Sequence, residues 1–93
     1  NKVLANGLGA EFREITTEEK EILKIHGGVK IEKLETGKLK RAGIENGFII
    51  TKIDGSKIEN YGNLKEKIEN RKGGVLLEGV YPNGTKAYYG LGL

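Results

Sequence analysis

The stretch Gly7-Leu8-Gly9-Ala10, which runs straight into Glu11-Phe12-Arg13-Glu14-Ile15, is the part of the sequence that decides the fold. Glycine tolerates positive φ, and successive N–H groups in such a bend can converge on one anion. The alternating segment that follows predicts a strand, with Ala10 and Phe12 on one face and Glu11 and Arg13 on the other. If that strand has an open edge, a guest peptide can pair with it and place its terminal carboxylate in the bend. An ordinary turn before a strand is the other interpretation of the same residues.

Length and composition indicate a single domain. The 93 residues fit one small domain over 1–93, and because the chain begins at Asn we expect it to be part of a longer protein. No basic and apolar leader stands at the start, and no apolar run approaches the roughly 20 residues of a membrane helix. Since the chain has no cysteine, a disulfide framework and a thiolate metal site are excluded.

The charges are mixed in sign. The net charge is +3, and the densest basic group, Lys38-Leu39-Lys40-Arg41, is short and has no aromatic residues between its charges. A surface that binds nucleic acid is usually a broader basic stripe. The pattern therefore favours a solvated surface, and we expect neither a nucleic-acid partner nor direct membrane insertion.

The hydrophobic pattern predicts more short strands than helices, and so an α+β fold that is mostly β: a small antiparallel barrel or sandwich capped by two helices. Residues 1–6 are too few to form a strand that pairs and then reaches the bend comfortably. In chain order we expect strands over 10–15, 29–34 and 48–53, a short strand over 57–58, and strands over 75–81 and 86–93. Helices are expected from Thr16, over 38–42 and over 61–71, with Asn60 capping the last of these and a turn at Asp54-Gly55. The helix from Thr16 has Ile22, Leu23 and Ile25 as its apolar stripe and ends at His26-Gly27-Gly28.

This order of motifs resembles a PDZ domain. Residues 7–10 match the family's Gly-Leu-Gly-Phe carboxylate loop in three of four positions, with Ala10 in place of a bulky apolar residue. Residues 39–53 resemble the central stretch of the family, and 61–68 resemble the helix that walls its groove. Because no full strand precedes the loop, the resemblance is to the circularly permuted bacterial type found in HtrA/Deg serine proteases of the cell envelope. It implies that the missing partner strand comes from 86–93 and pairs in the same sheet as the early strands.

The resemblance implies a peptide-binding module that captures C-terminal or exposed hydrophobic segments of protein substrates by strand addition. It implies that the parent protein is an HtrA/Deg-type serine protease of the periplasm or envelope, with this domain as its substrate-recognition or regulatory part. For Leu64 and Ile68, plain core packing is as good an interpretation as a place in the groove. The carboxylate loop would be Gly7, Leu8, Gly9 and Ala10, and the groove would be Glu11, Phe12, Arg13, Tyr61, Leu64, Lys65 and Ile68.

An enzyme is disfavoured. Asp54 and Ser56 share one tight turn, which is poor geometry for flanking His26 in a catalytic triad, and His26 lacks a second His or Cys for a zinc site. We therefore expect no catalytic residue, metal or cofactor in this chain. Two alternatives remain: a PDZ domain with a degenerate groove that contacts other subunits of the parent protease, and a PDZ domain of another envelope protease.

Overall fold

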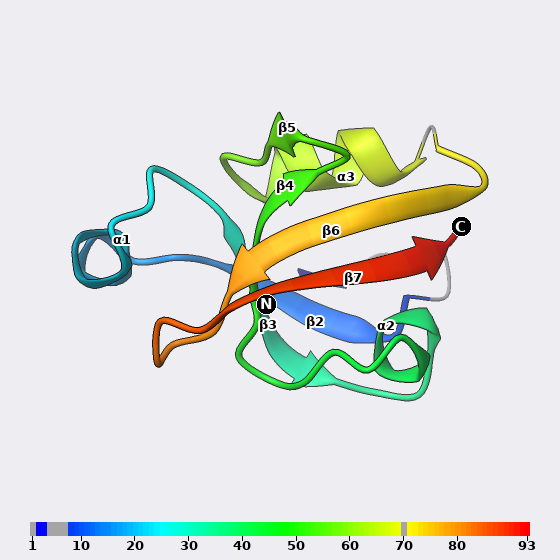
Figure 1. Ribbon diagram of the computed structural model, residues 1–93, viewed down its shortest axis with the longest axis horizontal. Coiled ribbons are helices and arrows are strands. Elements are labelled where there is room, and N and C mark those ends of the chain that lie inside the picture. Colours follow the sequence, from blue (N-terminus) through cyan, green and yellow to red (C-terminus); the bar gives the residue numbers. More distant parts are fainter. Residues whose placement is uncertain (1, 4–7, 70) are drawn as a thin grey trace.

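The computed structural model describes residues 2–3, 8–69 and 71–93, which form short helices set around one curved sheet (Figure 1). In chain order the elements are β1 (Lys2–Val3), β2 (Ala10–Glu14), α1 (Thr17–Leu23), β3 (Val29–Leu34), α2 (Lys38–Arg41), β4 (Ile49–Ile53), β5 (Ser56–Lys57), α3 (Tyr61–Glu69), β6 (Gly74–Val80) and β7 (Lys86–Gly92).

All strand pairs are antiparallel. The strands follow the order β1-β2-β3-β4-β6-β7, and β5 pairs with β4 beside that path. β6 and β7 pair along their whole length, from Gly74 opposite Gly92 to Val80 opposite Lys86. The prediction that the last strand joins the same sheet as the early strands is confirmed, although β7 pairs with β6 and β1 is the strand beside β2. Among the described strands β1 and β7 end opposite sides of the path, so the sheet stays open instead of closing into the expected barrel.

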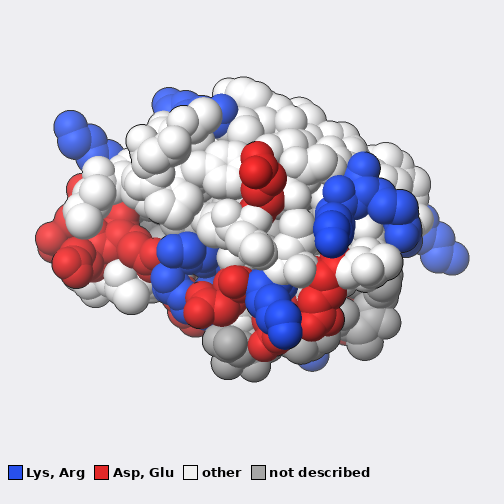
Figure 2. Space-filling model, turned by 90° about the horizontal axis from the view of Figure 1, so that it is seen from below, with Lys and Arg blue, Asp and Glu red and all other residues white. Residues whose placement is uncertain are grey.

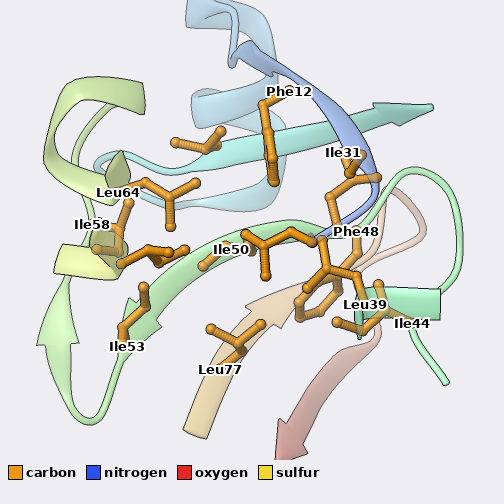
Figure 3. Packing of buried hydrophobic residues seen from close by; sticks show 14 of the residues in the cluster. Phe12, Ile31, Leu39, Ile44, Phe48, Ile50, Ile53, Ile58, Leu64 and Leu77 are labelled. Atoms are coloured by element: carbon orange, nitrogen blue, oxygen red, sulfur yellow. The ribbon is translucent and has the colours of Figure 1, made fainter. Parts of the chain in front are cut away.

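The main core lies inside this sheet, where β2, β3, β4 and β6 meet α2 and α3. Phe12 and Phe48 are fully buried and Leu39 is nearly so, and Figure 3 shows apolar side chains from these elements converging on one another. The Phe48 ring is perpendicular to that of Tyr89, with centroids 5.2 Å apart. A smaller cluster of Ile15, Ile49 and Val80 lies apart from the main core, with Leu23 and Ile25 packed against it.

The first helix begins as predicted but ends differently. The Thr16 hydroxyl accepts from the Glu19 N–H at 3.0 Å, and the Glu19 carboxylate accepts from the Thr16 N–H at 2.9 Å, which is a complete capping box. The helix ends at Lys24, in the left-handed region at φ 56°, and not at the glycines after His26. Its expected apolar stripe is wrong at Ile22, which is 69% exposed.

The second half follows the predicted order with small shifts. Asp54 and Gly55 both have positive φ, as a tight hairpin turn requires, but the returning strand is Ser56–Lys57 and not 57–58. The Asn60 side chain accepts from the Asn63 N–H at 2.9 Å, which confirms the predicted cap of α3. That helix ends at Glu69, before the predicted position 71, and Arg71 instead pairs with Asp54 at 2.6 Å.

Candidate functional site

The bend before β2 has both of its described carbonyl groups engaged. The Leu39 N–H donates to the Leu8 carbonyl at 3.1 Å, and the Glu35 N–H donates to the Gly9 carbonyl at 2.8 Å. Within residues 2–3, 8–69 and 71–93, no acceptor is found for the N–H groups of Leu8 and Gly9. The bend therefore offers donors rather than acceptors to a ligand. Gly7, the first residue of the predicted loop, lies outside the described residues.

Two glycines clamp this bend to the segment before α2. Gly9 has a φ of +78°, and a Cβ there would lie 2.5 Å from the Thr36 carbonyl oxygen. A Cβ on Gly37 would lie 2.6 Å from the Leu8 carbonyl oxygen. Real Cβ atoms do not approach backbone this closely, so both positions require glycine. Lys38 directly follows the clamp, and the sequence pattern alone had assigned it to the solvated surface.

The strand after the bend is tied to α3 at its far end. The buried Phe12 ring lies 6.1 Å from the Tyr61 ring, measured between centroids. The Tyr61 N–H donates to the two Glu14 carboxylate oxygens, at 3.0 and 3.3 Å. An acidic group is favourable at this position because the helix dipole is positive at its N-terminus. β2 and α3 are therefore held together at the end of β2 away from the bend.

The edge of β2 away from β3 carries a strand that the sequence interpretation had excluded. β1 pairs with β2 in antiparallel fashion, with Lys2 opposite Phe12 and Val3 opposite Glu11. The expectation that residues 1–6 are too few to form a pairing strand is therefore wrong. Two residues are enough because they add to the edge of an existing sheet and need no sheet of their own.

Comparison with known proteins identifies the family. Residues 7–80 match the family described as the Tricorn protease PDZ domain, and this span holds the bend, β2 and α3. The chain is a PDZ domain. A PDZ domain is a binding module and not a catalytic one, so the site is to be read as a surface for a ligand.

The chain is similar to one curated protease and to one solved PDZ domain. A probable periplasmic serine endoprotease, DegP-like, from Hahella chejuensis (strain KCTC 2396) is 31% identical over 64 residues, which is 69% of this chain and 14% of the relative. The chain thus spans a small part of that protease. The crystal structure of the HtrA3 PDZ domain bound to a phage-derived ligand, FGRWV, matches with a TM-score of 0.77 at 22% identity and covers 91% of this chain and 81% of that one. This second likeness concerns the fold.

The structure places many of the predicted loop and groove residues in the core of the PDZ domain. Five of them are at most 3% exposed: Leu8, Ala10, Phe12, Leu64 and Ile68. All five belong to the main hydrophobic cluster, so in this structure they pack against one another from β2 and from α3. Tyr61 is also buried, whereas Lys65 is exposed on α3. A ligand side chain that enters between β2 and α3 has to displace contacts among these groups.

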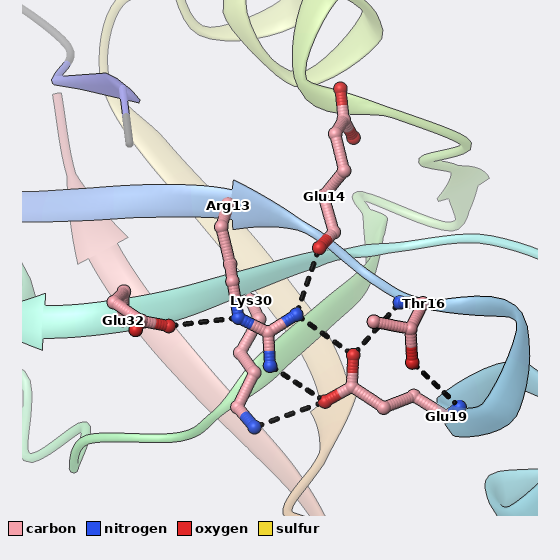
Figure 4. A network of polar contacts seen from close by, with 6 residues as sticks. All are labelled: Arg13, Glu14, Thr16, Glu19, Lys30 and Glu32. Atoms are coloured by element: carbon pink, nitrogen blue, oxygen red, sulfur yellow. Dashed lines mark hydrogen bonds and ion pairs between the residues drawn. The ribbon is translucent and has the colours of Figure 1, made fainter.

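Arg13, which the sequence analysis assigned to the groove, is part of an ionic network on the other face of β2 (Figure 4). Its guanidinium donates to both Glu19 carboxylate oxygens, at 2.8 and 2.9 Å, and to Glu32 at 2.8 Å. The Lys30 ammonium group donates to Glu19 at 3.0 Å. The network joins β2 and β3 to α1, so Arg13 positions the strand. The capping-box spacing marks Glu19 in the sequence, but no local pattern pairs it with Arg13.

The network holds Glu19 in its charged form. The Arg13 guanidinium, followed by the Thr16 N–H and the Lys30 ammonium, lowers the pKa of the Glu19 carboxyl far below its ordinary value, against an opposing effect of burial. The hydrogen bond to Glu19, and after it the one to Glu32, raises the pKa of Arg13 above its ordinary value, against an opposing effect of burial. Elsewhere on the surface, Lys and Arg lie beside Asp and Glu on the face shown in Figure 2.

A concavity of about 1160 Å³ lies between α1 and the sheet, lined mostly by residues that the sequence analysis did not select. The exposed side chains of Ile22 and Tyr88 both line it. It lies away from the bend, because neither Leu8 nor Gly9 lines it. It is a surface feature of the α1 side of the domain.

Asp54, one of the residues considered for chemistry, has a structural role. Asp54 accepts from the Leu76 N–H at 2.8 Å and pairs with Arg71, so its carboxylate holds the β4–β5 turn against β6. Across the described part of the chain, no group of three or more His, Cys, Asp or Glu residues is placed to hold a metal ion. No helix among the described residues has the length and apolar character needed to cross a bilayer.

Proposed function

We propose that this PDZ domain binds the C-terminal segment of a protein chain, which adds as a strand along β2 with its carboxylate on the N–H groups of Leu8, Gly9 and Ala10. The single observation that carries the proposal is the bend itself. Its carbonyl groups are bonded to Glu35 and Leu39, while no acceptor is found for its first two described N–H groups within residues 2–3, 8–69 and 71–93.

The apolar surroundings of the bend support an apolar last residue in the ligand. Leu8, Ala10 and Ile68 are buried and carry no polar side-chain atoms, and a charged ligand side chain buried among them would lack a partner. The HtrA3 PDZ domain, which shares this fold, is bound to a peptide of sequence FGRWV, which ends in valine. Hydrogen bonds to a charged group contribute roughly 1.5–3 kcal/mol each, partly offset by ordering of the peptide. Affinity in the micromolar range, near −8 kcal/mol, is expected.

We place this activity in a larger protein. The DegP-like relative, of which the chain spans 14%, is named as a periplasmic serine endoprotease. By this likeness the domain serves an HtrA/Deg-type protease in the periplasm or envelope. There it would recognise C-terminal or exposed hydrophobic segments of substrates, while peptide-bond cleavage belongs to another part of the protein.

The experiment compares FGRWV with a free carboxylate and FGRWV with an amidated C-terminus, by titration calorimetry and amide chemical shifts. Amidation removes the charge and places a donor against the donors of the bend, so affinity should fall about 30- to 150-fold, which corresponds to roughly 2–3 kcal/mol. The amide signals of Leu8, Gly9 and Ala10 should shift most. Equal affinity for the two peptides would refute the carboxylate site, and binding of neither would favour the degenerate groove of a subunit-assembly domain.

A further inference from the structure

β1 lies along β2 in the direction that a C-terminal ligand would take. The pairing is antiparallel, with Lys2 opposite Phe12 and Val3 opposite Glu11. β1 therefore runs toward the start of β2, where the bend with Leu8 and Gly9 lies. A peptide that adds to β2 in antiparallel fashion, with its carboxylate at that bend, runs the same way and meets the same two residues of β2.

The opposite edge of β2 is not available to a ligand. β3 pairs with it at five positions, from Ala10 opposite Leu34 to Glu14 opposite Val29. Each strand of a sheet has only two edges on which its backbone can hydrogen-bond. A peptide that adds to β2 must therefore take the edge on which β1 lies, and the two cannot both pair with Glu11 and Phe12.

We propose that β1 is a built-in competitor, so that a peptide binds only after Lys2 and Val3 have left the edge of β2. This inference rests on the proposed function, since it names what the incoming strand displaces. The pairing spans two residues, so the displaced form is a minor but accessible population. The apparent dissociation constant of a peptide equals its intrinsic value divided by the fraction of molecules with a free edge.

The first test removes the competitor. A variant that lacks residues 1–3 keeps β2, α3 and the bend, and it should bind free-carboxylate FGRWV about 3- to 10-fold more tightly than the full chain, as a free-edge fraction of about 0.1–0.3 requires. In the full chain, the amides of Lys2 and Val3 should exchange with deuterium faster when peptide is added, because the pairing that protects them is lost.

The second test locks the competitor in place. The chain has no cysteine, so the double variant Val3→Cys, Glu11→Cys can form only one disulfide. Opposed residues of an antiparallel pair have Cα atoms about 4.5–5.5 Å apart, within the range that a disulfide spans. The oxidised protein should bind FGRWV at least 100-fold more weakly than the reduced protein. The matched control, Glu78→Cys with Tyr88→Cys, joins a register pair of β6 and β7 far along the sheet and should bind equally in both redox states.

The outcomes separate this inference from the proposed function. Tighter binding by the shortened chain, with loss of binding in the oxidised lock that a reductant reverses, supports both. Equal binding by the full chain, the shortened chain and the oxidised lock overturns the competition and leaves the proposed function standing. Failure of even the shortened chain to bind the peptide overturns the proposed function and this inference with it. A thermal melt of the oxidised lock confirms that the domain remains folded.

Discussion

Replacement of Gly9 by alanine should destabilise the domain far more than a typical surface substitution. At φ +78° a non-glycine residue is strained, which costs roughly 1–2 kcal/mol. The new Cβ would also lie 2.5 Å from the Thr36 carbonyl oxygen, whereas ordinary contact begins at 3.4 Å. The three atoms nearest to this Cβ all belong to the backbone of Thr36 and Gly37. Because backbone atoms cannot rotate aside as a side chain can, the bend must move away from this segment.

That movement stretches the two hydrogen bonds that Leu8 and Gly9 accept from Leu39 and Glu35. Each such bond contributes about 1 kcal/mol. Together with the strained φ, the loss for Gly9→Ala comes to about 3–4 kcal/mol. This is a large share of the roughly 5–15 kcal/mol that holds a domain folded.

The matched control is Gly43→Ala. Gly43 also has a positive φ, +96°, but nothing lies within 4 Å of the position of its Cβ, so only the backbone strain of about 1–2 kcal/mol applies. Urea unfolding followed by circular dichroism should place the Gly9→Ala midpoint about 2 M below that of Gly43→Ala, for a slope near 1 kcal/mol/M. Equal midpoints would show that the contact of the bend with Gly37 contributes nothing to stability.

Two further predictions concern the ionic network and the last strand. The depressed pKa of Glu19 means that its charge stabilises the fold at any pH above the ordinary carboxyl value of about 4.3, and that this stabilisation is lost as the pH falls below that value. Glu19→Gln should therefore lower the free energy of unfolding by about 1–2 kcal/mol at pH 7. This difference from the parent chain should shrink as the pH falls from 5 to 2. A difference that stays constant with pH would contradict the prediction. Deletion of 86–93 removes a strand that pairs with β6 at seven positions, so the shortened chain should show no cooperative thermal transition by circular dichroism, and an unchanged melt would contradict the role of β7 in the sheet.

Features that depend on neighbours in the chain could be predicted from the sequence. The strand Val29–Leu34 and the short helix after Thr36-Gly37 lie where the pattern placed them. The Asp54-Gly55 turn and the Thr16 and Asn60 caps also agree. In each case the deciding interaction spans two to four residues, so the residue types at that spacing are sufficient to predict it.

Features that depend on distant segments could not be predicted in the same way. The left-handed Lys24 ends α1 although two glycines follow shortly after. Gly27 does not cap the helix but lies where the chain passes close to Glu59. A Cβ on Gly27 would lie 2.8 Å from the Glu59 Cα. Arg13 was expected beside a ligand but binds Glu19 and Glu32, which lie six and nineteen residues away in the sequence.

The sequence by itself determined the order of the elements from β2 onward, because alternation, capping residues and paired glycines act over a few residues. Only the tertiary structure decided how the candidate site is occupied. Whether Leu64 and Ile68 face a groove or a core depends on how closely α3 approaches β2, and here both are buried in the main cluster. Whether the edge of β2 is open depends on backbone pairing with Lys2 and Val3. The N–H and C=O groups that form such pairs are present in every non-proline residue, so the residue types give no sign of the pairing.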